Sequence, residues 1–535
     1  MTLSRRELLC GLLGVPLGFE ACRRSPRTVP GTLRGARIDL GHRLLEATRE
    51  RVSAPPEQVP VVIVGAGPSG LSAAWRLSRL GIEKYVVLDL ERLAGGTSAS
   101  ERDGVVPYPW GAHYVPLPRA DNAELVRLLE EVGAVRVDPS GAPEGLEQVR
   151  VRAPEERLFI DGTWIEGLFP SSRATESDRA ELLRFEAEIQ RYAAFRDGGG
   201  RRAFALPMRR CSDASEITAL DKVSAGQWLR QNGFRSKLLH WYVEYACRDD
   251  YGASLERTSA WAMFFYFCAR VGPSGDTAPF LTWPEGNGRV ARHLAERVGP
   301  RLRLNRLVTD VAPSADGVDV VALDEDGRAE TYRAEHVILA VPKLVVRRIL
   351  RPSPGAPQKL EGFHYAAWLV ANLHLSKRPR SRGFPFAWDN VLFDSVALGY
   401  VVATHQTLAD SGPSVWTYYR PFWEHAEPEA RKILRSLDHA TAAEAVLADL
   451  SRAHENLESC VERLDVYRWG HAMVTPLPGF IWGEERRSAA APQGRVVFAH
   501  SDLSGLPLLE EAFDRGVSAG EEVARQRGLT FDASG

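Results

Sequence analysis

An α/β fold is predicted for this chain of 535 residues by three features of its sequence. A continuous β-branched run, 61–64, leads through a glycine-rich turn into apolar residues at helical spacing. A second apolar run, 85–88, follows that helix, and uninterrupted runs of this kind are typical of parallel strands buried on both faces. A third such run, 495–498, lies near the end of the chain. We therefore expect one domain that is discontinuous in sequence.

The glycine-rich turn after the strand at 61–64 is the most specific of these features. Gly65, Gly67 and Gly70 form a Gly-x-Gly-x-x-Gly turn between strand and helix, and Asp89 follows Gly70 by 19 residues. This context is that of a Rossmann-type dinucleotide site. Gly65 allows the tight turn, Gly67 lets the backbone approach a pyrophosphate, and Gly70 lets the helix pack on the strand. The helix N-terminus then faces the phosphates, and Asp89 accepts hydrogen bonds from a ribose.

Composition excludes several classes of protein. The chain is 44% hydrophobic and 25% charged, which indicates a globular protein rather than a disordered one. Lys and Arg, 67 in all, nearly balance 69 Asp and Glu, for a net charge of -2, so we expect no nucleic-acid partner. The six cysteines are isolated from one another and have no metal-ligand spacing with histidine, so no metal site is expected.

The N-terminus has the pattern of a targeting segment. Arg5 and Arg6 precede an uncharged, largely apolar run that ends at Phe19. The run is too short to cross a bilayer core of ~30 Å. It resembles a twin-arginine export signal, used for proteins that fold around a cofactor before export; an amphipathic leader is the alternative. Ala21-Cys22 resembles a lipoprotein processing site. We expect export to the periplasm, with Cys22 as a candidate for membrane anchorage.

The segment after the second strand indicates which dinucleotide is bound. It runs from Asp89 to Gly95, Gly96 and Thr97 and resembles the corresponding segment of the flavin-containing amine oxidase, protoporphyrinogen oxidase and phytoene desaturase superfamily. Thr97 stands where that superfamily usually has an arginine, so the pyrophosphate needs another cation. Gly111 and Ala112 resemble the stretch of small residues that lies against the isoalloxazine ring.

The C-terminal part resembles the second flavin segment of the same superfamily. The strand at 495–498 leads to Asp502, which matches the acid near the ribityl chain. A helix that opens at 511–520 places Ala512 and Gly516 at the turn beside the flavin. A single NAD site has no use for so distant a segment, so the resemblance implies FAD.

Two residues depart from the superfamily pattern, and one further position matches it. His500 and Glu511 replace glycines that are usual in this segment. The backbone near Val308 corresponds to the part that touches the adenine. No cysteine stands in a position that resembles the covalent attachment site of monoamine oxidases, so the resemblance implies non-covalent FAD.

The organisation that follows is a Rossmann-type FAD-binding domain with an interleaved α+β substrate-binding domain. The expected segments are an export signal (1–30), a tether (31–56), FAD domain (57–121), substrate domain (122–280), FAD domain (281–352), substrate domain (353–465) and FAD domain (466–530). Helices are expected at 121–132, 176–195 and 222–248, and strands at 368–375, 399–403 and 415–419. The aromatic residues of 261–267 either line a pocket or, as is more usual at this density, pack in the core.

A flavin carries the difficult chemistry itself, so no catalytic triad is required, and none is visible. The resemblance implies two-electron oxidation of a small molecule, with oxygen, a quinone or a protein as electron acceptor. His113 and His471 are the candidate acid/base groups, although each is more often a structural histidine. Tyr467 and Trp469 are candidates for an aromatic pair that flanks an amine. The strand at 368–375 lacks the lysine that amine oxidases place near the flavin.

Three function classes stay open from the sequence. The first is an amine-oxidase-like enzyme that acts on a C–N bond, in a largely apolar pocket. The second is a desaturase or isomerase that acts on C–C bonds of an apolar, isoprenoid-like molecule. The third, a flavoprotein that serves as a scaffold, is disfavoured because both flavin segments are intact. Fold analogy does not choose between the first two.

Overall fold

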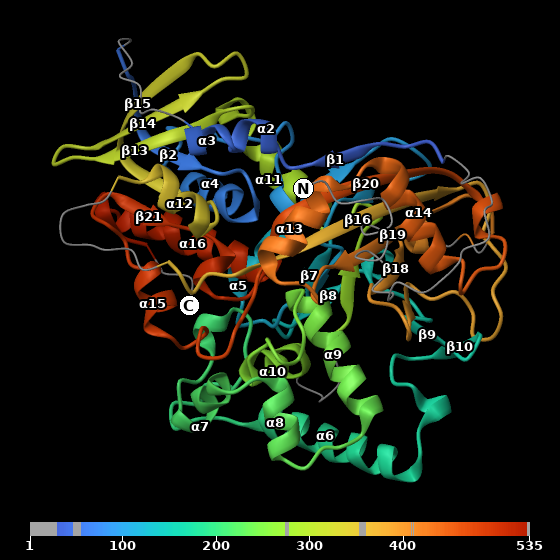
Figure 1. Ribbon diagram of the computed structural model, residues 1–535. Coiled ribbons are helices and arrows are strands. Elements are labelled where there is room, and N and C mark those ends of the chain that lie inside the picture. Colours follow the sequence, from blue (N-terminus) through green and yellow to red (C-terminus); the bar gives the residue numbers. More distant parts are fainter. Residues whose placement is uncertain are drawn as a thin grey trace.

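The computed structural model describes residues 29–46, 55–272, 278–351, 360–407, 409 and 411–531. The expected export signal and Cys22 lie outside these residues. Two large sheets dominate the structure, one at the upper left and one at the upper right of Figure 1, with a layer of helices below them. The predicted α/β fold class is confirmed.

The first sheet has seven strands in the order β12-β3-β2-β15-β14-β13, with β21 paired to β15. The strands β12, β3, β2, β15 and β21 pair in parallel, whereas β13 and β14 form an antiparallel extension. Their bounds are β2 (Glu57–Val64), β3 (Tyr85–Leu88), β12 (Leu302–Arg303), β13 (Leu307–Pro313), β14 (Val318–Leu323), β15 (Ala329–Leu339) and β21 (Val496–Phe498). Three stretches of the chain that are far apart in sequence thus build one sheet, as expected.

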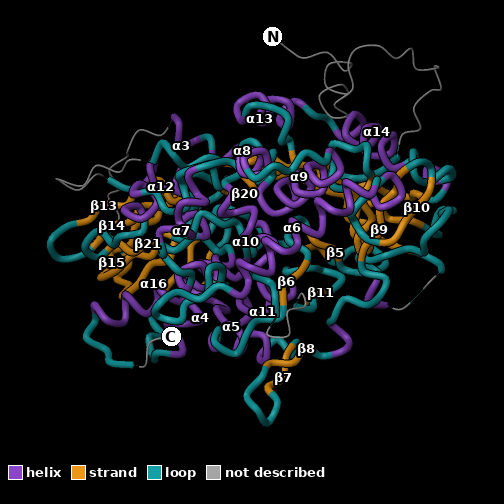
Figure 2. Tube along the Cα trace, turned by 90° about the horizontal axis from the view of Figure 1, so that it is seen from below, coloured by secondary structure: helices purple, strands orange, loops and turns teal. Residues whose placement is uncertain are grey.

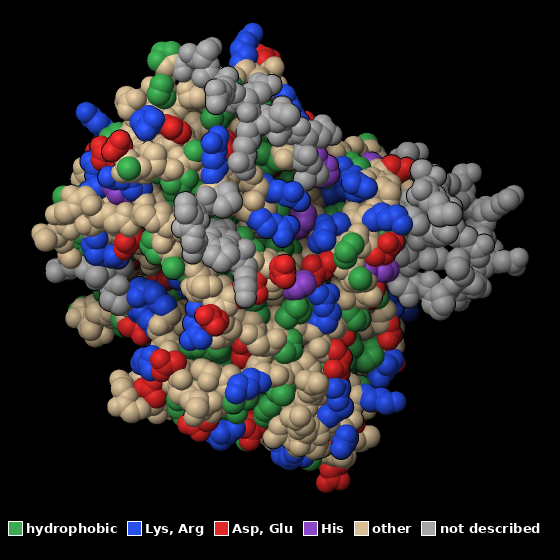
Figure 3. Space-filling model, turned by 60° about the vertical axis from the view of Figure 1, so that its left-hand side comes forward, with side chains coloured by type: hydrophobic (Ala, Val, Ile, Leu, Met, Phe, Trp, Pro, Cys, Tyr) green, Lys and Arg blue, Asp and Glu red, His purple; other side chains and the backbone are tan. Residues whose placement is uncertain are grey.

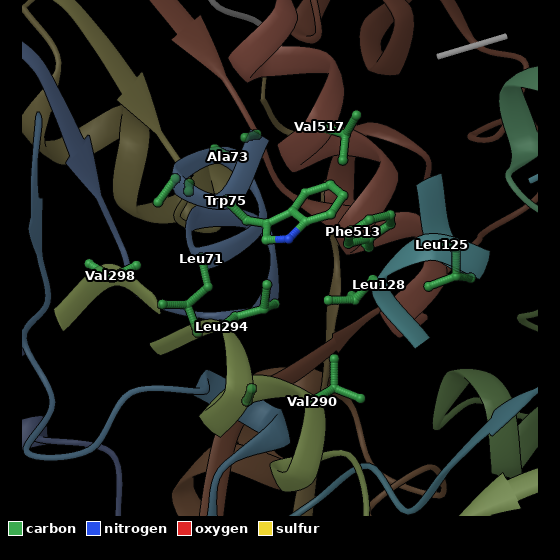
Figure 4. Close-up of a cluster of buried hydrophobic side chains, with 14 of the residues drawn as sticks. Leu71, Ala73, Trp75, Leu125, Leu128, Val290, Leu294, Val298, Phe513 and Val517 are labelled. Atoms are coloured by element: carbon green, nitrogen blue, oxygen red, sulfur yellow. The ribbon is translucent and has the colours of Figure 1, made fainter. Parts of the chain in front are cut away.

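Four helices cover one face of this sheet around a common core (Figure 4). They are α4 (Pro68–Arg79), α5 (Ala123–Glu131), α11 (Gly288–Val298) and α16 (Leu509–Gln526). The ring centroids of Trp75 and Phe513 lie 5.6 Å apart between α4 and α16. On the opposite face, side chains of β2, β3 and β15 share a second core with β13, β14 and α12 (Lys343–Ile349).

Gly516 corrects one expectation. It lies inside α16 rather than at a turn, and a Cβ there would be 2.2 Å from the Ser69 carbonyl oxygen of α4. Its lack of a side chain therefore serves the close crossing of two helices.

The second sheet has eight strands in the order β1-β20-β16-β19-β18-β17-β9-β10. Their bounds are β1 (Leu33–Gly35), β9 (Glu156–Ile160), β10 (Thr163–Glu166), β16 (Tyr365–Leu375), β17 (Asp389–Leu392), β18 (Gly399–Val402), β19 (Ser414–Pro421) and β20 (Val461–Val474). One face of β16 packs on α13 (Glu427–Ser436) and α14 (His439–Leu450). The other face, with Trp368, turns toward α9 (Lys237–Tyr251).

A helical layer lies beneath the second sheet in Figure 1. It consists of α6 (Glu176–Ala194), α7 (Ser215–Thr218), α8 (Ala225–Gln231), α9 and α10 (Ala260–Cys268), which share one core. The stretch 222–248, expected as one helical region, is two helices because Gly233 adopts a φ of 76° between α8 and α9. That left-handed conformation ends a helix.

Two expected boundaries differ from the structure. The supposed tether contains β1, which pairs in parallel with β20, and the short helices α2 (Ile38–Gly41) and α3 (Arg43–Glu46). Thr32 and Arg37 fix this segment to the body by hydrogen bonds to Asp465 and Glu91. The expected boundary at 465 also falls within β20, which pairs with β16 almost to its end.

The remaining elements are short. They are β4 (Ser100–Glu101), β5 (Tyr108–Pro109), β6 (Tyr114–Pro116), β7 (Val135–Val137), β8 (Pro143–Gly145), β11 (Phe280–Thr282) and α15 (Glu484–Ala489); Figure 2 shows the β7–β8 hairpin projecting from the body. Within the described ranges, no helix has the length and apolar character that crossing a membrane requires. On the face in Figure 3, acidic and basic side chains are interspersed, in keeping with the near-balanced charge.

Candidate active site

The glycine turn between β2 and α4 leaves open space at Gly67. Gly65 has a φ of 103°, and a Cβ there would be 2.4 Å from the Ala340 carbonyl oxygen, while a Cβ at Gly70 would be 1.8 Å from the Gly65 carbonyl oxygen. In contrast, a Cβ at Gly67 would meet no atom within 4 Å. Gly67 also begins α4 without a side-chain cap. The turn is thus tight where it packs and open where a pyrophosphate would meet the helix N-terminus.

The second glycine pair, Gly95 and Gly96, lies against this turn. The Gly95 amide donates to the Ala66 carbonyl oxygen at 2.8 Å, and a Cβ at Gly96 would be 3.3 Å from the Gly67 Cα. Asp89, at the end of β3, accepts hydrogen bonds from the Ala66 and Glu91 amides. Asp89, expected at the ribose, and both glycine segments are therefore brought together, and their fit to a dinucleotide is supported by the open space at Gly67.

The stretch expected against the flavin ring, Gly111 and Ala112 (the flavin stretch), is held by a hydrogen bond to Thr97 and by two strands of the second sheet. The Ala112 amide donates to the Thr97 carbonyl oxygen at 3.0 Å, and a Cβ at Gly111 would be 2.2 Å from that same oxygen. Tyr419 of β19 donates its hydroxyl to the Gly111 carbonyl oxygen at 2.8 Å. Trp469 of β20 donates to the neighbouring Trp110 carbonyl oxygen at 2.6 Å.

The other residues predicted to contact FAD, Asp502, Ala512 and Val308, lie in other parts of the structure. The Asp502 carboxylate accepts hydrogen bonds from the Lys343 amide at 2.9 Å and the Tyr365 hydroxyl at 2.6 Å. Ala512 is buried in the first turns of α16, and Val308 is buried in β13. Their contact with FAD stays a prediction.

A cavity of about 1300 Å³, counted to its open mouth, begins at this flavin stretch and lies between the second sheet and α9. Thr97, Gly111, Ala112 and Trp469 line one part of it. Most of the remaining wall is apolar, as expected, with Tyr114, Trp368, Trp388, Leu398, Val401 and Tyr419 among its side chains. Aromatic faces of this kind bind cations as well as apolar groups.

Of the two candidate acid/base histidines, only His113 lines the cavity. Its Nδ1 lies 3.2 Å from the Thr282 hydroxyl, its Nε2 has no hydrogen-bond partner among the described residues, and its ring packs edge-on to Trp388. Burial lowers the pKa of His113 to about 4, so the ring is neutral near pH 7. His471 has an exposed side chain on β20 and does not line the cavity.

Carboxylates in the cavity wall are the feature that sequence reasoning missed. They are Glu156, Asp249, Asp250, Asp389 and Glu510. Burial raises the pKa values of Glu156 and Glu510 to about 7 and lifts that of Asp389 well above its usual range. For Asp249, burial first and the neighbouring Asp250 charge second raise the pKa to about 7.

One cation lies among these acids. Arg270 makes a two-point hydrogen bond to Asp250 at 2.9 and 3.0 Å. For Glu156, Asp249, Asp389 and Glu510, no ion pair is found in the described part of the chain. The sequence offers one weak signal for this set, the adjacent acids Asp249 and Asp250 in the last turn of α9.

The two faces of strands β9 and β17 differ sharply in charge pairing. Glu156 and Asp389 are register partners and both line the cavity. The next pair in the register, Arg157 and Asn390, points to the opposite face, where Arg157 Nε donates to Asn390 Oδ1 at 2.5 Å. The buried polar groups are thus complementary on the far face and repulsive on the cavity face.

The aromatic residues of 261–267 and the pair Tyr467 and Trp469 lie partly in the cavity wall and partly outside it. Of the aromatic residues in 261–267, Tyr266 lines it, whereas Trp261, Phe264 and Phe265 are fully buried core residues. Trp469 lines it, and its ring stacks 4.3 Å from that of Tyr467, which does not. No lysine lines the cavity, and over the described ranges no group of side chains has the arrangement of a metal site.

Comparison with known proteins gives one family match and several relatives. The family described as flavin containing amine oxidoreductase matches residues 68–524. AofH of Mycobacterium tuberculosis, provisionally named a flavin-containing monoamine oxidase, is 28% identical over 499 residues, 89% of this chain and 98% of that protein. An L-amino acid dehydrogenase of Synechocystis is 23% identical and covers 88% of this chain and 95% of its own length.

Solved structures of amine oxidases share the fold. Wild-type putrescine oxidase bound to putrescine superposes with a TM-score of 0.64 at 21% identity, covering 88% of this chain and 100% of its own. Cyclohexylamine oxidase from Brevibacterium oxydans superposes with a TM-score of 0.64 at 16% identity, with the same coverage.

Proposed function

Since the chain belongs to the flavin containing amine oxidoreductase family, we propose that it oxidises the C–N bond of a protonated amine that carries no carboxylate. Family membership makes it an FAD-dependent oxidoreductase of the amine-oxidase type. Bound FAD supplies the two-electron chemistry, and the protein supplies binding, orientation and electrostatics.

The acid-lined cavity is the observation that carries this proposal. Buried carboxylates without a cation are costly, and a protonated amine provides the missing charge. An apolar, isoprenoid-like substrate would leave Glu156, Asp389 and Glu510 uncompensated, so the desaturase alternative is disfavoured. An amino acid substrate needs a cation for its carboxylate, and the cavity cation Arg270 is already taken by Asp250.

The chain's own residues have three tasks at this site. Tyr419 and Trp469 hold the backbone of the flavin stretch through the carbonyl oxygens of Gly111 and Trp110. The aromatic wall excludes water around the reacting carbon. His113, neutral near pH 7, is positioned to accept a hydrogen bond from the substrate at Nε2.

Anaerobic mixing of the purified yellow protein with a panel of amines, L-amino acids and polyenes tests the proposal. We expect amines alone to bleach the visible flavin absorbance. Bleaching by a polyene and by no amine would overturn it in favour of the desaturase alternative. Acid precipitation of the same preparation should leave FAD in the supernatant if the cofactor is held without a covalent bond.

We also propose that the protein is exported by the twin-arginine route, to the periplasm or to a membrane anchor at Cys22. The support is the Arg5-Arg6 pair before a short apolar run and the need to fold around FAD before transport. Replacing both arginines by lysine keeps the charge and should block export. Arrival of the double-lysine variant in the periplasm would contradict the proposal, and incorporation of a labelled fatty acid tests Cys22.

A further inference from the structure

The cavity is elongated across the second sheet. Its sheet wall is formed, strand by strand, by Val370 of β16, Tyr419 of β19, Val401 of β18, Asp389 of β17 and Glu156 of β9. Neighbouring strands lie about 4.8 Å apart. Tyr419 is hydrogen-bonded to the flavin stretch. Its strand β19 is two strands from β17, which carries Asp389, and three strands from β9, which carries Glu156, so the separations are about 10 Å and about 14 Å.

The end remote from the flavin stretch gathers three carboxyl side chains that have no ion pair among the described residues. Glu156 and Asp389 face each other across β9 and β17, and α9 contributes Asp249 over the same region. The Tyr245 hydroxyl donates to Asp389 Oδ2 at 3.1 Å, and Asp389 has no cationic partner among the described residues. We call Glu156, Asp249 and Asp389 the acidic end.

A second, independent observation points to a polar ligand for the cavity. Glu510 is 4% exposed, lines the cavity, and its Oε1 has no hydrogen-bond partner among the described residues. His113 Nε2 and the indole nitrogen of Trp388 also line the cavity and also have no hydrogen-bond partner among the described residues. Buried polar atoms of native proteins are normally paired, so several unpaired atoms in one cavity point to a ligand that pairs with them.

We propose that the acidic end binds a second protonated nitrogen of the substrate, so that the substrate is a long diamine or a polyamine. The proposal rests on the proposed function, because the first nitrogen is taken to react at the flavin stretch. The strand spacing sets the separation of the two nitrogens at about 10–14 Å. Between them, the methylene chain lies along the aromatic wall formed by residues such as Tyr114, Trp388 and Tyr419.

A metal ion is a poorer occupant of the acidic end. Within the part of the chain that the structure describes, no three of its Asp, Glu, His or Cys side chains are arranged as metal ligands. Hard cations need several oxygen ligands at short, fixed distances. An alkylammonium tolerates the wider spacing of these carboxylates, because its charge is satisfied by hydrogen bonds and by aromatic faces.

The test uses the FAD-loaded enzyme and α,ω-diaminoalkanes of increasing length, each paired with the n-alkylamine of the same length. Wild type should prefer the long diamine over its monoamine by at least about 100-fold in kcat/KM, with little preference for the shortest diamines. Glu156→Gln and Asp389→Asn should each lower kcat/KM for the long diamine at least about tenfold more than kcat/KM for its monoamine. Glu155→Gln, an exposed neighbour of Glu156, is the matched control and should keep the full preference.

Melting temperature provides a readout that does not need turnover. A long diamine should raise the melting temperature of wild type and of Glu155→Gln, but not that of the Glu156→Gln, Asp389→Asn double variant. If monoamines and diamines bleach the flavin equally, or if the variants change both alike, the acidic end does not bind a second nitrogen. If no amine bleaches the flavin, the proposed function fails, and the melting shifts still decide whether the acidic end binds a dication.

Discussion

Glu156 and Asp389 are direct neighbours across the parallel strands β9 and β17, and both carboxylates face the same cavity. Like charges directly opposite each other destabilise a sheet. The fold therefore retains a pair that weakens it, and a role in binding explains why. Such a trade of stability for function is common at active sites.

Removing the buried Glu156 carboxylate should stabilise the protein in a pH-dependent way. Burial raises the pKa of Glu156 from 4.5 to about 7, so the unfolded chain ionises before the folded protein does. The resulting destabilisation is absent below about pH 4, grows as the pH rises to about 7, and is complete above that. Glu156→Gln should thus increase the free energy of unfolding at about pH 8 by up to about 3 kcal/mol and have no effect at about pH 4.

Denaturant unfolding at both pH values measures this effect. The control Glu155→Gln, with an exposed side chain, should stay within about 0.5 kcal/mol of wild type at both. A Glu156→Gln variant that is less stable than wild type at about pH 8 would show that the carboxylate is a structural group.

Gly67→Ala separates cofactor binding from folding. A Cβ at Gly67 meets no atom within 4 Å, so the variant should fold and melt like the wild-type apoprotein. The added methyl group occupies the space expected for the pyrophosphate, so FAD retention after gel filtration should fall at least about tenfold. Gly198→Ala, in an exposed loop with equally open space, is the control and should retain FAD. Full flavin content in Gly67→Ala would place the pyrophosphate elsewhere.

The two histidines should differ in their effect on turnover. His113→Ala should lower kcat by no more than ~10²- to 10⁴-fold, the usual range for acid/base assistance. Because burial lowers the pKa of His113 to about 4, the variant should leave the pH profile above about pH 6 unchanged. His471→Ala should stay near wild type, since its side chain is exposed and outside the cavity wall. A kinetic pKa near neutrality that disappears in His113→Ala would contradict this assignment.

The cofactor half of the site could be predicted from the sequence, and the substrate half could not. Gly65, Gly67, Gly70 and Asp89 act within one βαβ unit, so their spacing along the chain reflects their spacing in the fold. Gly65 and Gly70 are also required by close backbone contacts, and Gly67 keeps open the space expected for the pyrophosphate, which makes the pattern specific.

The acids of the cavity have no such local signature. Glu156, Asp249, Asp389 and Glu510 are separated by long stretches of chain and are brought together by strand order, by α9 and by α16. Read singly, each is an ordinary solvated carboxylate. For the same reason β1 was missed: a three-residue strand exists because β20 offers its edge, which no local pattern encodes.

Reoxidation by oxygen should be slow. The strand β16 carries no lysine, and none lies in the cavity wall among the residues that the structure describes. After anaerobic reduction by an amine, stopped-flow mixing should therefore show return of the flavin absorbance at least about tenfold faster with a soluble quinone than with oxygen. Reoxidation by oxygen at the rate of the quinone would show that this lysine is dispensable here.

Product analysis after a single anaerobic turnover tests C–N oxidation most directly. The FAD-loaded protein is mixed with one equivalent of a long diamine, and the products are identified once the flavin is bleached. Loss of two electrons and two protons across the C–N bond, followed by addition of water, should yield an aldehyde and a released ammonia or amine, each equal to the flavin reduced. A bleached flavin together with a product that keeps its C–N bond and gains a C=C bond would contradict the assignment.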